Sequence, residues 1–74
     1  MPKLPVVSGA ETIKKLEKLG YIVTRPKGSH VRLHHPTDPS KKPITIPLHE
    51  ELKRGLLNQI LKDADISREA FSSL

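Results

Sequence analysis

A turn between two strand-forming runs restricts the fold of this chain more than any other feature. The turn is Lys27-Gly28-Ser29, and Gly28, which has no Cβ, permits a tight reversal. Residues 21–25 are rich in β-branched and aromatic side chains and predict a strand that Pro26 ends. The alternating residues 30–35 predict a second strand. Together these features predict an antiparallel hairpin.

Alternation along residues 30–35 assigns the two faces of the predicted sheet. Val31 and Leu33 point to one side, where we expect the helices. The outward side chains, open to solvent or to a ligand, are those of His30, Arg32 and His34. The first strand is ambiguous, because Ile22 competes with the Tyr21/Val23 pair for the inner face.

A capped amphipathic helix precedes the hairpin. Ser8 and Glu11 have the spacing of a capping box, in which each side chain bonds a free backbone N–H of the other residue. Four apolar residues then recur at helical spacing: Ala10, Ile13, Leu16 and Leu19. Because Gly20 is a natural residue to follow a last helical turn, we predict a helix over residues 9–19. The lysines on or near its polar face are Lys14, Lys15 and Lys18.

The rest of the chain predicts one more strand and one more full helix. Residues 36–43 have the composition of a loop, and residues 44–46 form a short strand that its flanking prolines place at a sheet edge, with both isoleucines inward. A second helix ends at Asp65-Ile66, and Gly55 leaves its first turn undefined. Its apolar stripe is Leu52, Leu56, Leu57, Ile60, Leu61 and Ala64. Ser67 can cap a short final helix that acts as a lid on the core.

The order of elements is therefore helix, strand, strand, strand, helix. We predict an α+β fold in which two helices cover one face of a three-stranded antiparallel sheet. A chain of 74 residues is the size of one small domain, so we expect residues 1–74 to form a single domain, with residues 1–7 as an extended lead-in.

The charge of the chain is basic and uneven. Residues 1–49 carry nine Lys/Arg and three acidic residues, whereas residues 50–74 carry four and five. The positive charge lies in the half that contains the hairpin and favours binding of a polyanion such as nucleic acid. An acidic protein is the competing partner. The simplest alternative is that the charge only keeps the protein soluble. The absence of cysteine, of a signal peptide and of a long apolar run leads us to expect a cytoplasmic protein without a membrane span.

His30 is the first candidate for chemistry. RNA carries its own nucleophile, the 2′-hydroxyl, so an enzyme that cleaves it needs an imidazole for proton transfer and cations for the phosphate. The cations within reach of the turn are Lys27, Arg25 and Arg32. On spacing alone, a lone histidine at a turn is more often just a polar surface residue.

Other classes of site have weaker signals. His34 could be a second proton carrier or a surface residue, His35 belongs to the loop, and His49 could come near His30 only if the third strand lies beside the second. The histidines lack acidic ligands at metal spacing, so we predict no metal site and no cofactor. Tyr21 and Phe71 are the only aromatic residues, too few for a platform that stacks bases.

Several blocks of the chain resemble one known family. Gly20-Tyr21, Lys27-Gly28-Ser29-His30, His35-Pro36, Ile44-Thr45-Ile46-Pro47 and the long block from Leu52 to Ala64 resemble the HicA toxins of bacterial toxin–antitoxin systems, over roughly residues 8–66. One departure is Val31, where many relatives have a polar residue.

The resemblance implies a fold like that of double-stranded-RNA-binding domains and a metal-independent ribonuclease that cleaves mRNA. It implies that His30 is the catalytic residue. For this activity we expect substrate binding by Lys27, Gly28, Ser29, Arg32 and, less certainly, Arg25. It also implies a HicB-type antitoxin as a partner that binds the toxin in a hetero-oligomer and covers the site.

Two other functions remain open from the sequence. The first is a non-catalytic double-stranded-RNA-binding module, whose affinity would come from Lys14, Lys15, Lys18, Lys41 and Lys42. The second is a protein-interaction element for an acidic partner, which a toxin would also have.

Overall fold

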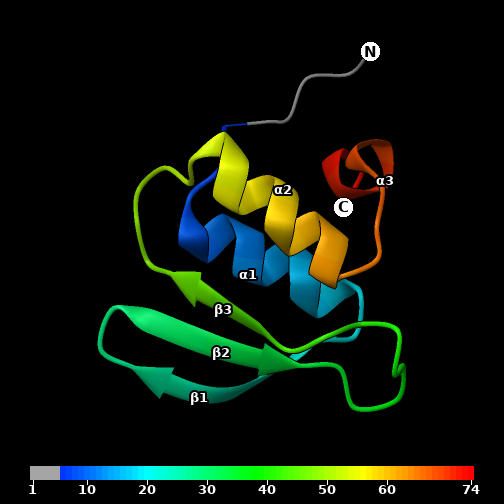
Figure 1. Ribbon diagram of the computed structural model, residues 1–74. Coiled ribbons are helices and arrows are strands. Elements are labelled where there is room, and N and C mark those ends of the chain that lie inside the picture. Colours follow the sequence, from blue (N-terminus) through cyan, green and yellow to red (C-terminus); the bar gives the residue numbers. More distant parts are fainter. Residues whose placement is uncertain (1–5) are drawn as a thin grey trace.

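The computed structural model describes residues 6–74, except for the side chains of Pro26 and Lys27. Its elements are α1 (Gly9–Lys18), β1 (Ile22–Lys27), β2 (His30–His34), β3 (Ile44–Pro47), α2 (Arg54–Asp63) and α3 (Arg68–Ser72). β2 lies between β1 and β3 and is antiparallel to both. α1 and α2 lie together on one side of the sheet (Figure 1). The predicted α+β fold is confirmed, and so is the edge position of the third strand.

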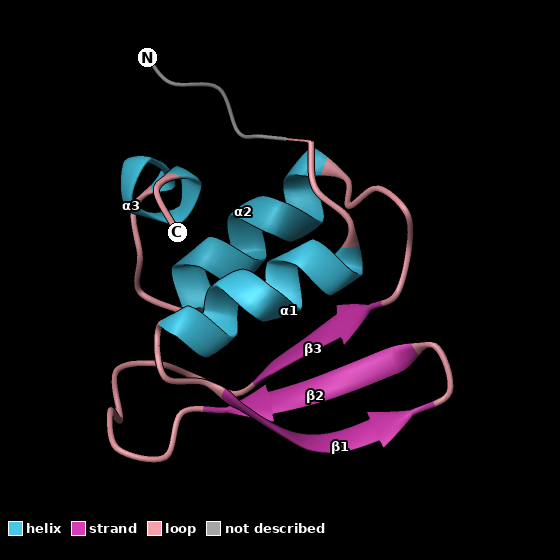
Figure 2. Cartoon of the chain, turned by 180° about the vertical axis from the view of Figure 1, so that it is seen from behind, coloured by secondary structure: helices cyan, strands magenta, loops and turns pink. Residues whose placement is uncertain are grey.

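The core lies between the sheet and the helices. Val31 and Leu33 of β2 face inward, and the two isoleucines of β3 are also buried, as predicted. Leu16 of α1 and Leu57 of α2 meet them from the helical layer. Seen from behind, the opposite face of the sheet is covered by no described helix (Figure 2). The structure therefore leaves one sheet face open, as the alternation in β2 required.

Both long helices end in the same type of C-terminal cap. After α1, the Gly20 N–H donates to the Glu17 carbonyl and the Tyr21 N–H donates to the Leu16 carbonyl, with Gly20 at φ +102°. After α2, Asp65 adopts the left-handed backbone conformation at φ +53°, and the Ile66 N–H donates to the Leu61 carbonyl. The predicted capping box at the start of α1 is also present, because Ser8 and Glu11 each accept the other's backbone N–H.

The first strand differs from its prediction. Tyr21 is 2% exposed but precedes β1, whereas Ile22 and Val23 are 49% and 39% exposed. A bulge between Val23 and Arg25 shifts the register, so simple alternation does not describe this edge strand. Pro26 does not end the strand, since it pairs with Val31 of β2. An edge position tolerates proline because one side of the strand needs no backbone donor.

The apolar faces of the two helices also differ from their predictions. Ala10 is exposed, and Thr12 is the fully buried residue of that turn because its hydroxyl donates to the Ser8 carbonyl at 2.9 Å. Leu56 is 36% exposed, and Leu52 is buried although it precedes α2. The second strand and the first helix each end one residue earlier than predicted.

The two ends of the chain contribute to the same core. Of the predicted lead-in, residues 1–5 lie outside the described part of the chain, but Val7 is 3% exposed and its carbonyl accepts the Leu52 N–H at 2.9 Å. The predicted final helix is present as α3, and Ser67 caps it by accepting the Ala70 N–H. Phe71 is fully buried, so α3 contributes a core side chain as well as covering the core.

Candidate active site

The β1–β2 turn fixes where His30 stands. Lys27 and His30 are Cα partners, so the turn itself consists of Gly28 and Ser29. Gly28 has φ +57°, and a Cβ built on it would meet nothing within 4 Å. The backbone angle, rather than lack of space, is therefore what favours glycine at this position. The Ser29 carbonyl accepts the Leu48 N–H at 2.7 Å, which ties the turn to the chain that leaves β3.

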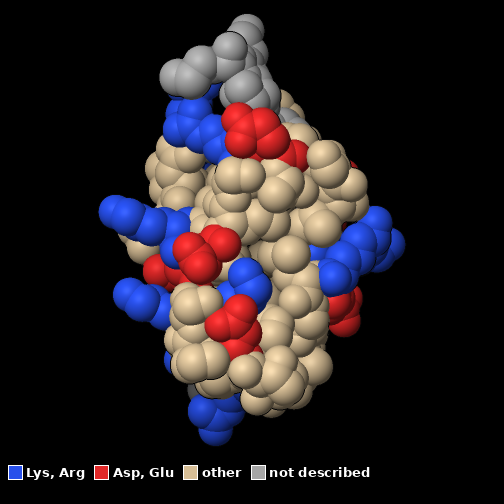
Figure 3. Space-filling model, turned by 90° about the vertical axis from the view of Figure 1, so that its right-hand side faces the viewer, with Lys and Arg blue, Asp and Glu red and all other residues tan. Residues whose placement is uncertain are grey.

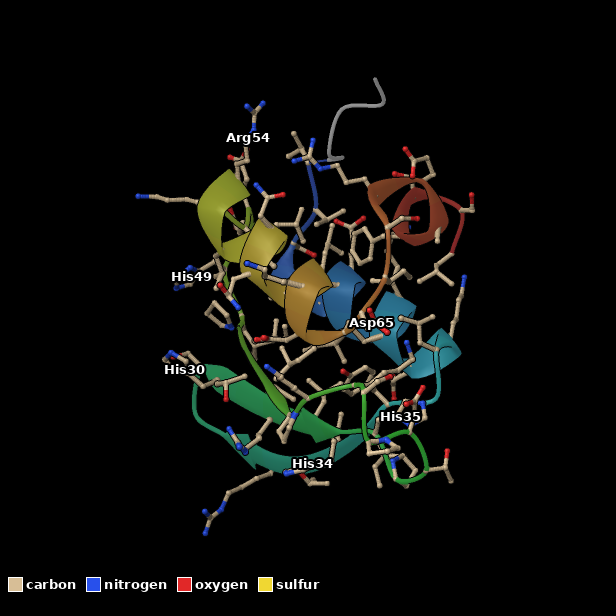
Figure 4. All side chains as sticks on the ribbon, turned by 45° about the vertical axis from the view of Figure 1, so that its right-hand side comes forward. His30, His34, His35, His49, Arg54 and Asp65 are labelled. Atoms are coloured by element: carbon tan, nitrogen blue, oxygen red, sulfur yellow. The ribbon has the colours of Figure 1, made fainter. Side chains whose placement is uncertain are left out.

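His30 is exposed at the first position of β2. Its Nδ1 lies 3.3 Å from the Ser29 hydroxyl oxygen, so one ring nitrogen has a partner within the turn. Figure 4 shows His30 at the outer edge of the molecule, directed away from the helices. The side chain is thus accessible to a large substrate, as the alternation in β2 predicted.

Arg25 and Arg32 form a positively charged row across the open face. They are Cα partners on β1 and β2, and both are exposed. Arg32 Nη1 donates to the Thr45 hydroxyl on β3 at 3.1 Å, which holds the guanidinium against the sheet. Like charges directly opposite each other on neighbouring strands are destabilising. An anion bound between these two side chains would relieve that repulsion.

The predicted site residues therefore gather at one place, with one exception. His30, Arg25 and Arg32 share the open face, and Gly28 with Ser29 form the turn beside them. The backbone of Lys27 pairs with His30, but the side chain of Lys27 lies outside the described part of the structure.

His34 and His35 lie away from the turn (Figure 4). His34 is four residues further along β2, about 13 Å at 3.3 Å per residue, and its Nδ1 lies 2.7 Å from the Thr24 hydroxyl. His35 packs edge-on against the Tyr21 ring, its Nε2 donates to the Leu19 carbonyl at 2.9 Å, and its Nδ1 accepts the Asp38 N–H at 3.0 Å. With both ring nitrogens bonded, His35 connects α1 to the β2–β3 loop and serves the fold.

His49 is the histidine that the sequence could not place. Because β3 lies beside β2, the residues that follow β3 reach the same edge as the turn, and His49 is exposed there. From the sequence, His49 could be placed near His30 only on the condition that the third strand lies beside the second.

Two of the lysines proposed for a nucleic-acid face are bound within the fold. Lys15 Nζ donates to the carbonyls of Phe71 and Leu74 at 3.2 and 3.0 Å, and it lies 5.2 Å from the centre of the Phe71 ring. Lys41 Nζ donates to the Ala64 carbonyl at 2.8 Å, at the end of α2. Lys15, predicted on or near the polar face of the helix, is partly buried, and its side chain reaches the end of α3.

The described surface carries mixed charge on one side of the molecule. On the face to which α3 and the β2–β3 loop belong, acidic and basic side chains are interspersed (Figure 3). A row of arginines, by contrast, crosses the open sheet face. A polyanion would therefore meet less repulsion on the sheet than on this helical side.

The clearest pKa shifts occur far from the turn. Burial raises the pKa of Tyr21 to about 12, and the Asp63 and Asp38 carboxylates add to the rise. The Tyr21 hydroxyl donates to the Lys42 carbonyl at 2.8 Å. Hydrogen bonds from the Ser40 side chain and backbone lower the pKa of Asp38. These groups hold the β2–β3 loop rather than the candidate site.

Within residues 6–74, no group of three or more His, Asp or Glu side chains is arranged to hold a metal ion. None of the helices formed by these residues is long and apolar enough to cross a membrane.

Comparison with known proteins identifies the family. No curated protein matches the chain. The sequence model of a family described as "HicA toxin of bacterial toxin-antitoxin" matches residues 9–66, which run from the first residue of α1 to the residue that closes the cap of α2. The matched region includes the hairpin turn, the arginine row and all three strands. The chain therefore belongs to the HicA toxin family of bacterial toxin–antitoxin systems.

Proposed function

We propose that this protein is the toxin of a type II toxin–antitoxin system and acts as an endoribonuclease on mRNA, with His30 as a general acid or base. The observation that carries the proposal is the exposed imidazole of His30 at the turn, beside a row of two arginines on the only helix-free sheet face of the described structure. Imidazole can exchange protons near neutral pH, and the guanidinium groups can stabilise charge on a phosphate.

The reaction needs no nucleophile from the protein. An imidazole takes the proton of the RNA 2′-hydroxyl, the 2′ oxygen attacks the adjacent phosphorus, and the bond to the 5′ oxygen breaks as that oxygen gains a proton. The products are a 2′,3′-cyclic phosphate end and a free 5′-hydroxyl end. Arg32, held by Thr45, and Arg25 opposite it would bind the phosphates, together with Lys27. Chelation of divalent metals should leave the rate unchanged.

The test is cleavage of purified mRNA by the wild-type protein and by His30→Ala. We expect fragments with cyclic phosphate ends from the wild type and a loss of at least about 100-fold in rate for His30→Ala. His34→Ala is the matched control, because His34 is on the same strand but at the other end of it. Full RNA-cleaving and growth-arresting activity in His30→Ala would refute the assignment.

We also propose that a HicB-type antitoxin neutralises the toxin by covering the open sheet face. The exposed arginine row and the positive charge of residues 1–49 suit an acidic partner surface. Co-expression with a HicB-type antitoxin should restore growth and protect mRNA. Restored growth in the presence of continued RNA cleavage would contradict the proposal.

A further inference from the structure

His49 lies at the same edge of the molecule as His30. Pro47, the last residue of β3, is the Cα partner of His30, and the next residue, Leu48, donates its N–H to the Ser29 carbonyl. His49 follows directly. Figures 1 and 4 agree in placing the hairpin turn and the chain between β3 and α2 at one edge, where His30 and His49 are both found.

The carbonyl of His49 is hydrogen-bonded to the start of α1, while its side chain is exposed. The Gly9 N–H, at the start of α1, donates to the His49 carbonyl at 2.9 Å. Gly9 packs so closely against the Pro47 carbonyl that a Cβ would overlap it. The imidazole of His49 is nevertheless exposed. A side chain whose backbone is held in place and whose ring is open to solvent suits proton transfer to a bound substrate.

The other two histidines are less suitable as partners of His30. His34 is about 13 Å along the strand, and its Nδ1 is bonded to Thr24. His35 has both ring nitrogens bonded within the fold. Adjacent strands are only about 4.8 Å apart, so residues beyond β3 can approach a phosphate held at the turn from the side opposite to β1.

We propose that His49 is the second proton-transfer group of the reaction, a role that rests on the proposed ribonuclease function. One of the two imidazoles, neutral, takes the proton from the 2′-hydroxyl as the new oxygen–phosphorus bond forms. The other, protonated, gives its proton to the 5′ oxygen as the old bond breaks. One proton is taken up and one is released, so the step balances without a metal or any other reactant.

Charged residues of both signs lie near His30 and His49 along the chain. Glu50 and Glu51 follow His49 in the same loop, Arg54 begins α2 beyond them, and Arg32 lies two residues along β2 from His30. All four side chains are exposed, so solvent screens their influence on both imidazoles.

The experiment measures kcat and KM over about pH 5 to 9, where histidine titrates, on a short RNA that contains a site cut by the wild-type protein. The variants are His49→Ala, His49→Gln and the control His34→Ala. We expect a bell-shaped profile for the wild type. Both His49 variants should lose at least about 100-fold in kcat with little change in KM, and one limb of the profile should disappear. His34→Ala should keep both limbs.

Folding is checked by thermal unfolding, which should be unchanged because His49 is exposed and its bond to Gly9 is made by the backbone. If His49→Ala keeps both limbs and a kcat within roughly threefold of the wild type while His30→Ala is inactive, His49 has no catalytic role and the ribonuclease assignment stands. A raised KM with both limbs intact would make His49 a binding residue, which also overturns the inference. Full activity of His30→Ala would instead refute the ribonuclease assignment itself.

Discussion

At the scale of single residues, close contacts decide which side chains serve the fold and which remain free for chemistry. Tyr21 and His35 pack edge to face at 5.3 Å and use their polar atoms to hold the chain around the β2–β3 loop. His30, in contrast, is exposed, and its Nδ1 lies within hydrogen-bond distance of the neighbouring Ser29 hydroxyl. Histidine is therefore exposed at the first position of β2 and packed into the fold just after its last.

The pKa of Tyr21 predicts a loss of stability in strong alkali. Burial raises the pKa from its ordinary value of 10.0 to about 12, so the unfolded chain releases the phenolic proton first. The contribution is fully present below pH 10 and is lost as the pH rises toward about 12. Because Tyr21 is the only tyrosine, the absorbance of tyrosinate reports it directly.

We expect the native protein to titrate at about 12 and the denatured protein near 10. Tyr21→Phe should lose less stability than the wild type across this interval. A native midpoint near 10 would show that the hydroxyl is not shielded as the structure requires.

Gly9→Ala should destabilise the protein by about 1–3 kcal/mol, because the new methyl group would overlap the Pro47 carbonyl and push α1 away from β3. Gly55→Ala is the matched control in α2. A Cβ there meets nothing within 4 Å, and alanine is the better helix former, so this change should be neutral or stabilising by up to about 1 kcal/mol. Denaturant midpoints measure the stability change of each variant. Equal midpoints for the two variants would contradict the close packing of α1 on β3.

At the scale of elements, long side chains from one element cap the ends of others. Lys15 of α1 bonds the last carbonyls around α3, and Lys41 of the β2–β3 loop bonds the end of α2. Cations are favourable at helix C-termini, where carbonyl groups lack partners. These contacts join elements that are far apart in the sequence.

Lys15→Met should therefore lower the stability by about 1–2 kcal/mol, because it removes two hydrogen bonds and the cation from above the Phe71 ring. Lys14→Met, an exposed neighbour on the same helix, should change stability by less than about 0.5 kcal/mol. Thermal unfolding compares the two. A Lys14 effect as large as that of Lys15 would show that general charge, rather than the contact with α3, is responsible.

At the scale of the whole molecule, the two layers have different tasks. The helices bury one sheet face and use part of the lysine set for internal contacts, while the other sheet face stays open with its arginine row and the turn. The competing hypothesis, a non-catalytic double-stranded-RNA-binding module, relied on lysines of which Lys15 and Lys41 are bound internally.

The salt dependence of RNA binding should separate the two faces. Each phosphate contact on a single strand contributes about 0.7 to the slope of log affinity against log salt, so Arg25→Ala with Arg32→Ala should lower the slope by about 1.4. Lys14→Ala with Lys18→Ala, on the helical side, should leave it nearly unchanged. The reverse pattern would favour binding through the helices.

The sequence by itself determined the order of elements, the capping box, the turn at Gly28 and the outward direction of His30 and Arg32. These depend on contacts within a few residues, whose preferences are local. The tertiary structure alone decided that Tyr21 is buried while Ile22 and Val23 are exposed, because a bulge at an edge strand breaks simple alternation. It also decided that Lys15 caps α3 and that His49 lies at the same edge of the molecule as His30. Both depend on which distant elements become neighbours.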